Sequence, residues 1–153
     1  MNDPRVNTPI HDLVTRWFFD EYLHAWVRVG AGASSLGPEF ILDYWAVPMH
    51  YSADQTNQWL LDAAAVVRFS EQAHIRFRGQ GLPPRPFPNH RATVYNSGGA
   101  AIEAILLRCR ADGSEIERLA AHFELALGPT GWRMVGIQTA QTVADSLTTA
   151  WPG

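Results

Sequence analysis

An α+β domain is predicted, in which two helices and an extended pair precede a four-stranded antiparallel meander. Two patterns carry this prediction. Apolar residues recur at helical spacing in two stretches, one after Asp12 and one after Asp62. From residue 89 onward the spacing changes to alternation, interrupted by three turn segments.

The first helix is expected to begin at Asp12, which can cap it, and to end at Gly30 and Gly32. Its polar residues follow one stripe at i+4 spacing, so most of the remaining circumference is apolar. The stripe consists of Asp12, Arg16, Asp20, His24 and Arg28.

The extended pair is "FILDYWAVPMHYS" followed by "NQWLLD", and Pro48 marks an edge position or a bulge in it. The second helix opens at Asp62, and Gly79 and Gly81 stop it. Its apolar residues recur at i, i+3, i+7 and i+11, which is typical of a helix packed on one side. They are Val66, Phe69, Ala73 and Phe77.

The meander is divided by turns at 96–99, 112–113 and 128–131. Asp112-Gly113 is a strong two-residue hairpin pattern, because aspartate and glycine both tolerate the backbone that such a turn needs. The strands on either side of these turns are therefore expected to pair with their neighbours along the chain.

This order of elements resembles the cone-shaped fold of the NTF2-like superfamily, in particular its SnoaL-like branch. The resemblance rests on the aromatic-rich first helix, "ILDYWAVPMHYS", "RCRADGSEIERLAAHFEL" and "GPTGWRM", and it covers roughly residues 10 to 142. It implies a curved antiparallel sheet wrapped around the N-terminal helices, and we expect a single domain over residues 1–153.

Composition limits the partners. Twelve basic against fifteen acidic side chains give a net charge of −3, which argues against a nucleic-acid partner. Cys109 is the only cysteine, so a reducing cytoplasmic location is compatible. The start of the chain lacks a signal-peptide pattern, and no apolar run approaches the ~20 residues that span a bilayer. We expect a soluble, cytoplasmic protein that does not enter membranes.

Turn positions determine which side chains share a face of the meander, because side chains alternate along a strand. The turns place Arg91 opposite Ala104, Ala104 opposite Ala121, and Ala121 opposite Gln138. Two alanines among large residues leave room for a pocket floor, with a polar group at either end. The expected ligand is a small hydrophobic molecule. The residues expected to contact it are Tyr22, Trp26, Arg91, Ala104, Ala121, Trp132 and Gln138.

The opposite face of the meander is expected to carry a second set of apolar residues and to form a homodimer, since these residues cannot all stay in water. They are Val94, Ile105, Leu107, Val135 and Ile137. Glu103 and His122 lie opposite each other on this face and are expected to serve the interface rather than catalysis, although a histidine–carboxylate pair is also a candidate base. The Arg108–Glu117 pair is expected to be an ordinary surface pair.

The resemblance extends to ketosteroid isomerases and SnoaL-like cyclases, which implies acid–base chemistry on a ring. Tyr22 matches the isomerase tyrosine, but Val47 precedes Pro48 and Ala121 stands at the second acid position, so both carboxylates of that pattern are absent. No metal spacing or nucleotide fingerprint is present, and no cofactor is expected.

Three functions stay open from the sequence alone. The first is a ligand-binding dimer with an isomerase, cyclase or dehydratase activity. The second is a non-catalytic ligand-binding or assembly module, and the third, more remote, is a protein-binding domain. Trp17, Trp26, Trp45 and Trp132 are candidate walls for a flat ligand.

Overall fold

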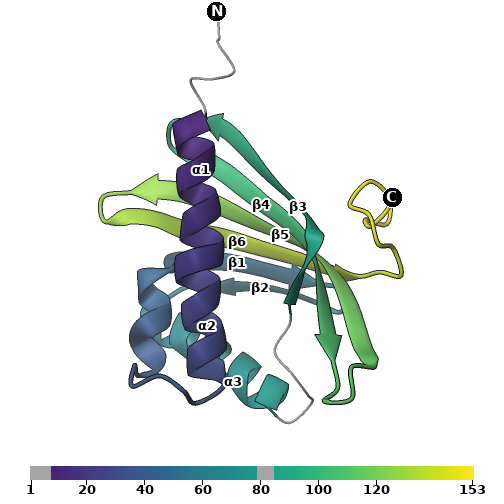
Figure 1. Cartoon of the computed structure of the whole chain (residues 1–153). Coiled ribbons are helices and arrows are strands. Elements are labelled where there is room, and N and C mark those ends of the chain that lie inside the picture. The colour runs from purple at the N-terminus through teal and green to yellow at the C-terminus, as the bar shows by residue number, and fades with distance from the viewer. Residues whose placement is uncertain (1–7, 79–84) are drawn as a thin grey trace, which may run out of the picture.

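The computed structural model describes residues 8–78 and 85–153. A long helical run opens the fold and lies across the sheet (Figure 1). It is formed by α1 (Thr8–Arg16), the π-helical η2 (Trp17–Tyr22) and α2 (Leu23–Gly30). The short η3 (Pro38–Asp43) and α3 (Ala63–Arg78) complete the helices. Both predicted helices are present, although the first begins at Thr8 and contains a π-helical turn.

Six strands form one curved sheet (Figure 1). They are β1 (Trp45–Ala53), β2 (Thr56–Leu60), β3 (Arg85–Asn96), β4 (Gly99–Cys109), β5 (Glu115–Gly128) and β6 (Gly131–Gln141). Their order is β2-β1-β6-β5-β4-β3. The α+β cone-like class is confirmed, with one refinement. β1 pairs with β6 in parallel, and every other pair is antiparallel.

The inner face of the sheet packs on the N-terminal helices through aromatic rings. Phe18, which is fully buried, lies 4.8 Å from Phe123 of β5 between ring centroids. Phe19 lies 4.5 Å from the ring of His90 on β3. The π-helical turn thus presents consecutive aromatic residues to the sheet, and their burial anchors the helical run.

The outer face is partly covered by the chain's own C-terminal segment, residues 142–153. Ile105 and Ala120 of the outer face are fully buried and pack in one cluster with Ala150 of this segment. Arg118 Nη1 donates a hydrogen bond to the Ala144 carbonyl oxygen at 3.2 Å, and Asn89 donates to the carbonyl oxygen of Asp145. The segment therefore covers part of the face through which a second copy of the chain was expected to bind.

From Gly99 to Arg108 the β4–β5 register agrees with the prediction, because Ala104 pairs with Ala121 and Leu106 with Leu119. Next to the turn it shifts by one residue, since Cys109 pairs with Glu115. On the flanking pairs two bulges shift it. Tyr95 is an extra residue of β3, between the Val94–Ala100 and Asn96–Gly99 pairs.

Val135 is the extra residue of β6, between Met134, which pairs with Leu125, and Gly136, which pairs with Glu124. Seen from the turn, a bulge places the side chains beyond it on the face opposite to the one predicted. The bulge at Tyr95 therefore reverses the predicted faces of β3, and the bulge at Val135 reverses those of β6.

The dimer argument loses most of its residues as a result. Val94 now pairs with Ala100, and Ile137 with Phe123, so both belong to the inner face. Ile105 lies under the C-terminal segment. The expectation that five apolar side chains share one exposed face was wrong. Among the described helices, none is long and apolar enough to cross a membrane.

Candidate functional site

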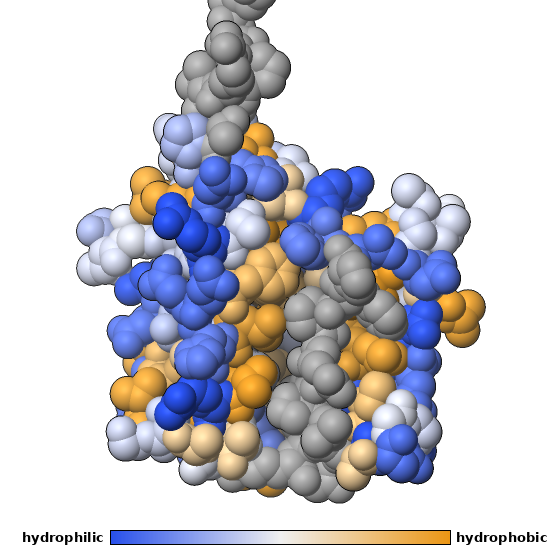
Figure 2. Space-filling model, viewed as in Figure 1, coloured by the Kyte–Doolittle hydropathy of each residue, from blue (hydrophilic) through white to orange (hydrophobic). Residues whose placement is uncertain are grey.

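A cavity of about 670 Å³ lies between the helical run, the β1–β2 hairpin, α3 and the inner face of the sheet. Figure 2 shows apolar side chains gathered in a hollow beside the N-terminal helices. The volume falls within the ~300–1,000 Å³ typical of small-molecule pockets. Its apolar wall is mainly aromatic, with contributions from Phe18, Tyr22, Trp26, Trp45, Tyr51, Phe69 and Phe123.

The part of the cavity where these aromatic rings gather is called its aromatic end. Tyr22 and Trp45 are two buried side chains there that carry polar atoms. Tyr22 is 4% exposed, and burial raises the pKa of its phenol, against a smaller lowering by a hydrogen-bond contact with the Trp45 side chain. The phenol therefore stays protonated and can donate a hydrogen bond. Trp45 is 3% exposed and stacks on Trp26 at 5.6 Å, and its Nε1 makes no well-aligned hydrogen bond with any described residue.

The other end of the cavity is charged. Arg108 of β4 and Glu117 of β5 form an ion pair there, and both line the cavity. The Arg108 side chain is 6% exposed and that of Glu117 is 26% exposed. The expectation of an ordinary surface pair was wrong. Alternation along β4 places Arg108 on the same face as Ala104 and Leu106, and this parity is present in the sequence.

Tyr22 and Trp26 line the cavity, where the sequence analysis placed them. Ala104 and Ala121 are fully buried on the inner face, but they are not in the wall of this cavity. They are flanked by His90 and Phe123, the two ring partners of the helix residues Phe19 and Phe18.

Helix side chains therefore pack next to Ala104 and Ala121, so these two alanines do not form the predicted open floor of a pocket. Trp132 is also packed in the core cluster, away from this cavity.

Arg91 and Gln138 were predicted on the inner face and lie on the outer one, which corrects both placements. Because of the bulge at Tyr95, Arg91 pairs with Glu103 instead of Ala104. Because of the bulge at Val135, Gln138 pairs with His122 instead of Ala121. Neither side chain can reach the cavity through the sheet.

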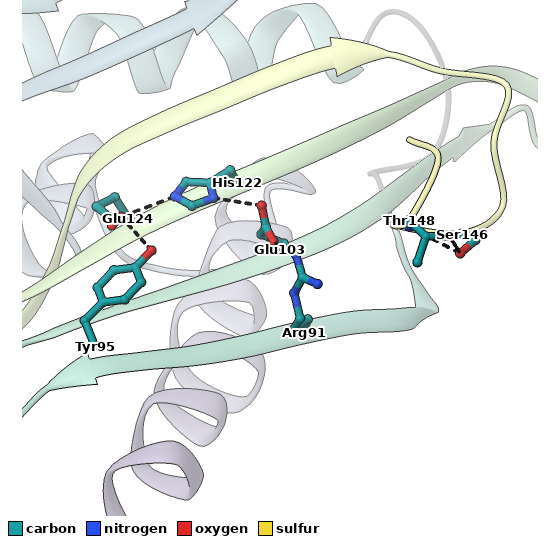
Figure 3. A network of polar contacts seen from close by, with 7 residues as sticks. All are labelled: Arg91, Tyr95, Glu103, His122, Glu124, Ser146 and Thr148. Carbon is teal, nitrogen blue, oxygen red and sulfur yellow. Dashed lines mark hydrogen bonds and ion pairs between the residues drawn. The ribbon is translucent and has the colours of Figure 1, made fainter. Parts of the chain in front are cut away.

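On the outer face Arg91 joins a polar network with side chains of β4 and β5 (Figure 3). Arg91 Nη2 donates to Glu103 Oε1 at 2.5 Å, and His122 Nδ1 lies 3.0 Å from Glu103 Oε2. His122 Nε2 lies 3.3 Å from Glu124 Oε1, to which the Tyr95 hydroxyl donates at 3.2 Å. Burial alone would raise the pKa of Glu103, but the hydrogen bonds and charges of His122 and Arg91 together lower it.

Sequence reasoning missed a second group of polar contacts beside this network, which joins β6 to β1 and β2. Gln138 Nε2 lies 3.1 Å from His50 Nδ1, and His50 Nε2 lies 2.5 Å from Asn57 Oδ1. The Ser52 hydroxyl donates to the Gln138 side-chain oxygen. Polar side chains thus lie in one row across the outer face, from β3 to β2. The only sequence pattern that could have indicated the part on β1 is the alternation of polar and apolar residues in "MHYSA".

Glu103 and His122 therefore do not enter the cavity, as the sequence analysis expected, while their role at an interface stays a prediction. Within residues 8–78 and 85–153, no group of three histidine, cysteine or acidic side chains could hold a metal ion. The cavity instead combines a neutral donor end, at Tyr22 and Trp45, with a carboxylate at the other end, at Glu117. Such a set can bind an acceptor oxygen and can, in principle, move a proton.

Comparison with known proteins identifies the fold. The model of the family described as "NTF2-like protein (DUF6841)" matches residues 11–142. Among solved structures, an NTF2-like protein with a cystatin-like fold from Novosphingobium aromaticivorans is 18% identical, with a TM-score of 0.62 over 97% of this chain and 95% of that one. No curated protein matches the sequence.

Two further structures are similar over most of their length. A protein of unknown function from the DUF3225 family of Pectobacterium atrosepticum is 16% identical, with a TM-score of 0.60 over 88% of this chain and 91% of that one. A domain of unknown function with a cystatin-like fold from Nostoc punctiforme is 15% identical, with a TM-score of 0.61 over 89% and 80% of the two chains. At these identities the likeness shows the fold and not the ligand.

Proposed function

The chain belongs to the NTF2-like family DUF6841, and within this fold we propose that the cavity binds a small, flat, mostly apolar molecule that carries a hydrogen-bond-accepting oxygen. The aromatic wall suits a flat ring, because rings gain both buried area and favourable stacking geometry there.

The indole nitrogen of Trp45, which is buried beside Tyr22 without a well-aligned hydrogen bond, is the observation that carries this proposal. A buried donor without a partner costs about 1–3 kcal/mol, because the group has lost water and gained nothing in exchange. A ligand oxygen placed near Trp45 Nε1 and the Tyr22 hydroxyl would recover this energy. Pockets that select a ligand commonly combine apolar walls with a few such directed polar groups.

An acid–base enzyme of the isomerase, cyclase or dehydratase type is the second candidate, favoured by the carboxylate of Glu117 in the cavity wall. In this version Tyr22 would hold the substrate oxygen and Glu117 would exchange the proton. The Glu117 carboxylate is already engaged in the ion pair with Arg108, so it is not free to take a proton from a substrate. The non-catalytic ligand-binding function is therefore the one we favour.

Titration with prodan, a neutral naphthalene ketone whose emission depends on polarity, tests the first proposal. We expect saturable binding with a blue shift, and a loss of about two- to tenfold in affinity in Trp45→Phe, which removes one N–H donor but keeps an aromatic ring. Trp59→Phe is the matched control, because Trp59 is 62% exposed on β2. Equal affinity of Trp45→Phe and the wild type would show that the indole nitrogen does not meet the ligand.

A further inference from the structure

The cavity has two ends of different chemistry, and they lie far apart along β5. Phe123 stands at the aromatic end and Glu117 at the charged end. At about 3.3 Å per residue, the strand between them is about 20 Å long. A compact ring bound beside Tyr22 and Trp45 would leave the charged end empty, so a ligand that fills the cavity has to be elongated.

Arg108 determines what the charged end can bind. A guanidinium does not lose its proton in proteins, so its positive charge stays in the cavity wall and needs an anion beside it. In the structure this anion is Glu117, whose carboxylate accepts a hydrogen bond from Arg108 Nη2. Two cationic side chains, Arg108 and Arg76 of α3, line the same cavity.

Glu117 is held less firmly than Arg108. It is the more exposed partner of the pair, and it lies near the start of β5. It also borders a second hollow, formed by the start of β5 and the C-terminal segment, where Arg118 and Trp151 are among the lining residues. Glu117 is thus bordered by open space on two sides of the start of β5, whereas Arg108 is confined by its burial.

We propose, on the basis of the ligand-binding function above, that the natural ligand is an elongated apolar carboxylic acid, and that Glu117 occupies the place on Arg108 which the ligand carboxylate takes on binding. The exchange is non-covalent: one carboxylate leaves the guanidinium and another arrives, and the buried charge stays neutralised throughout. Planar carboxylate and guanidinium groups form charge-assisted hydrogen bonds, which gives this end its preference for an acid over an ester or an alcohol.

The test compares cis-parinaric acid with its methyl ester, both detected by energy transfer from the cavity tryptophans. Glu117→Gln removes the competing carboxylate and should raise the affinity for the acid by about tenfold, with little change for the ester. In the double variant Arg108→Gln/Glu117→Gln, acid and ester should bind equally. Arg110→Gln and Glu115→Gln are the controls, since both residues are exposed on the same hairpin and neither lines this cavity.

Opposite outcomes separate the two proposals. If Glu117→Gln weakens the acid, or if acid and ester bind equally in every variant, the placeholder role of Glu117 is wrong, while binding of the ester and of prodan would still support the cavity function. If wild type binds none of the three probes, the cavity function itself fails. Glu117→Gln leaves Arg108 in place at a partly exposed pair, so this variant carries the test even if the double variant does not fold.

Discussion

Adding volume at two alanines distinguishes the filled part of the inner face from the open part. Ala121 is fully buried in the core cluster, whereas Ala73 of α3 lines the cavity. The pair Ala121→Phe and Ala73→Phe inserts the same side chain at each position. We expect the first variant to lose stability and the second to lose ligand binding.

The magnitudes follow from the space at each site. Ala121 has no free volume above it, so a phenylalanine overpacks the core at a cost of about 1–3 kcal/mol. For a chain of this size that lowers the melting temperature by roughly 2–12 °C. At Ala73 the ring enters the cavity. Its lower helix propensity costs about 0.5 kcal/mol, and contacts with the aromatic wall offset part of that cost.

Thermal unfolding by circular dichroism and titration with prodan measure the two effects. Ala73→Phe should melt close to the wild type and bind the probe at least tenfold more weakly, because the ring and the ligand compete for one space. Ala121→Phe should melt lower and, where folded, keep its affinity. The reverse result, a stable Ala121→Phe that no longer binds, would place the void above the alanine row and refute the packing described here.

Three further predictions concern the outer face. The pKa of Glu103 is lowered in the folded protein from the unfolded value of 4.5. The stability that Glu103 contributes is therefore present above pH 4.5 and is lost as the pH falls through the pKa of the folded state. Glu103→Gln should remove this loss, so the unfolding free energy should fall less steeply with decreasing pH than in the wild type. Ile105→Glu should bury a charge under residues 142–153, detach this segment from the sheet and make it more sensitive to proteases. Protease sensitivity equal to that of the wild type would contradict the packing of this segment over Ile105. The homodimer remains a proposal, now through the uncovered half of the face where Tyr95 and Trp59 are exposed; sedimentation velocity should show a dimer that Tyr95→Glu weakens, and a wild-type monomer at low micromolar concentration would exclude it.

The order of elements could be predicted from residue spacing alone, because helical and alternating patterns reflect which sides of each element are buried. The β4–β5 register from Gly99 to Arg108 was also predicted, although the turn differs from the expected two-residue hairpin. Arg110 N donates to the Ser114 carbonyl oxygen, so the loop spans residues 111–113, and the extra residue Ile116 of β5 restores the predicted pairing. The irregularity expected at Pro48 is present, because the pairing of β1 with β6 shifts between Trp45 and His50.

The bulges at Tyr95 and Val135 could not be predicted, because neither residue carries a local pattern that requires an extra position. Each bulge adds one residue to one strand only. It can be recognised only when the pairing of that strand with its partner is known. Arg91 and Gln138 were therefore assigned to the wrong face although the strands themselves were right. Arg108 is the opposite case: its parity was readable, but its charge and its pairing with Glu117 suggested a surface location.

The alanine pair explains why a cavity is difficult to infer from one strand at a time. Small residues on a sheet leave space above them, and the same space can hold a ligand or a large side chain from the opposing layer. Here the opposing layer brings Phe18 and Phe19 in consecutive positions of a π-helical turn, and their rings contact the residues on either side of Ala104 and Ala121. The open volume lies instead where Ala73 of α3 faces the aromatic wall. Whether small residues form a cavity thus depends on the side chains of both layers together. In this protein the space stays open next to Ala73 of α3 and is occupied next to Ala104 and Ala121.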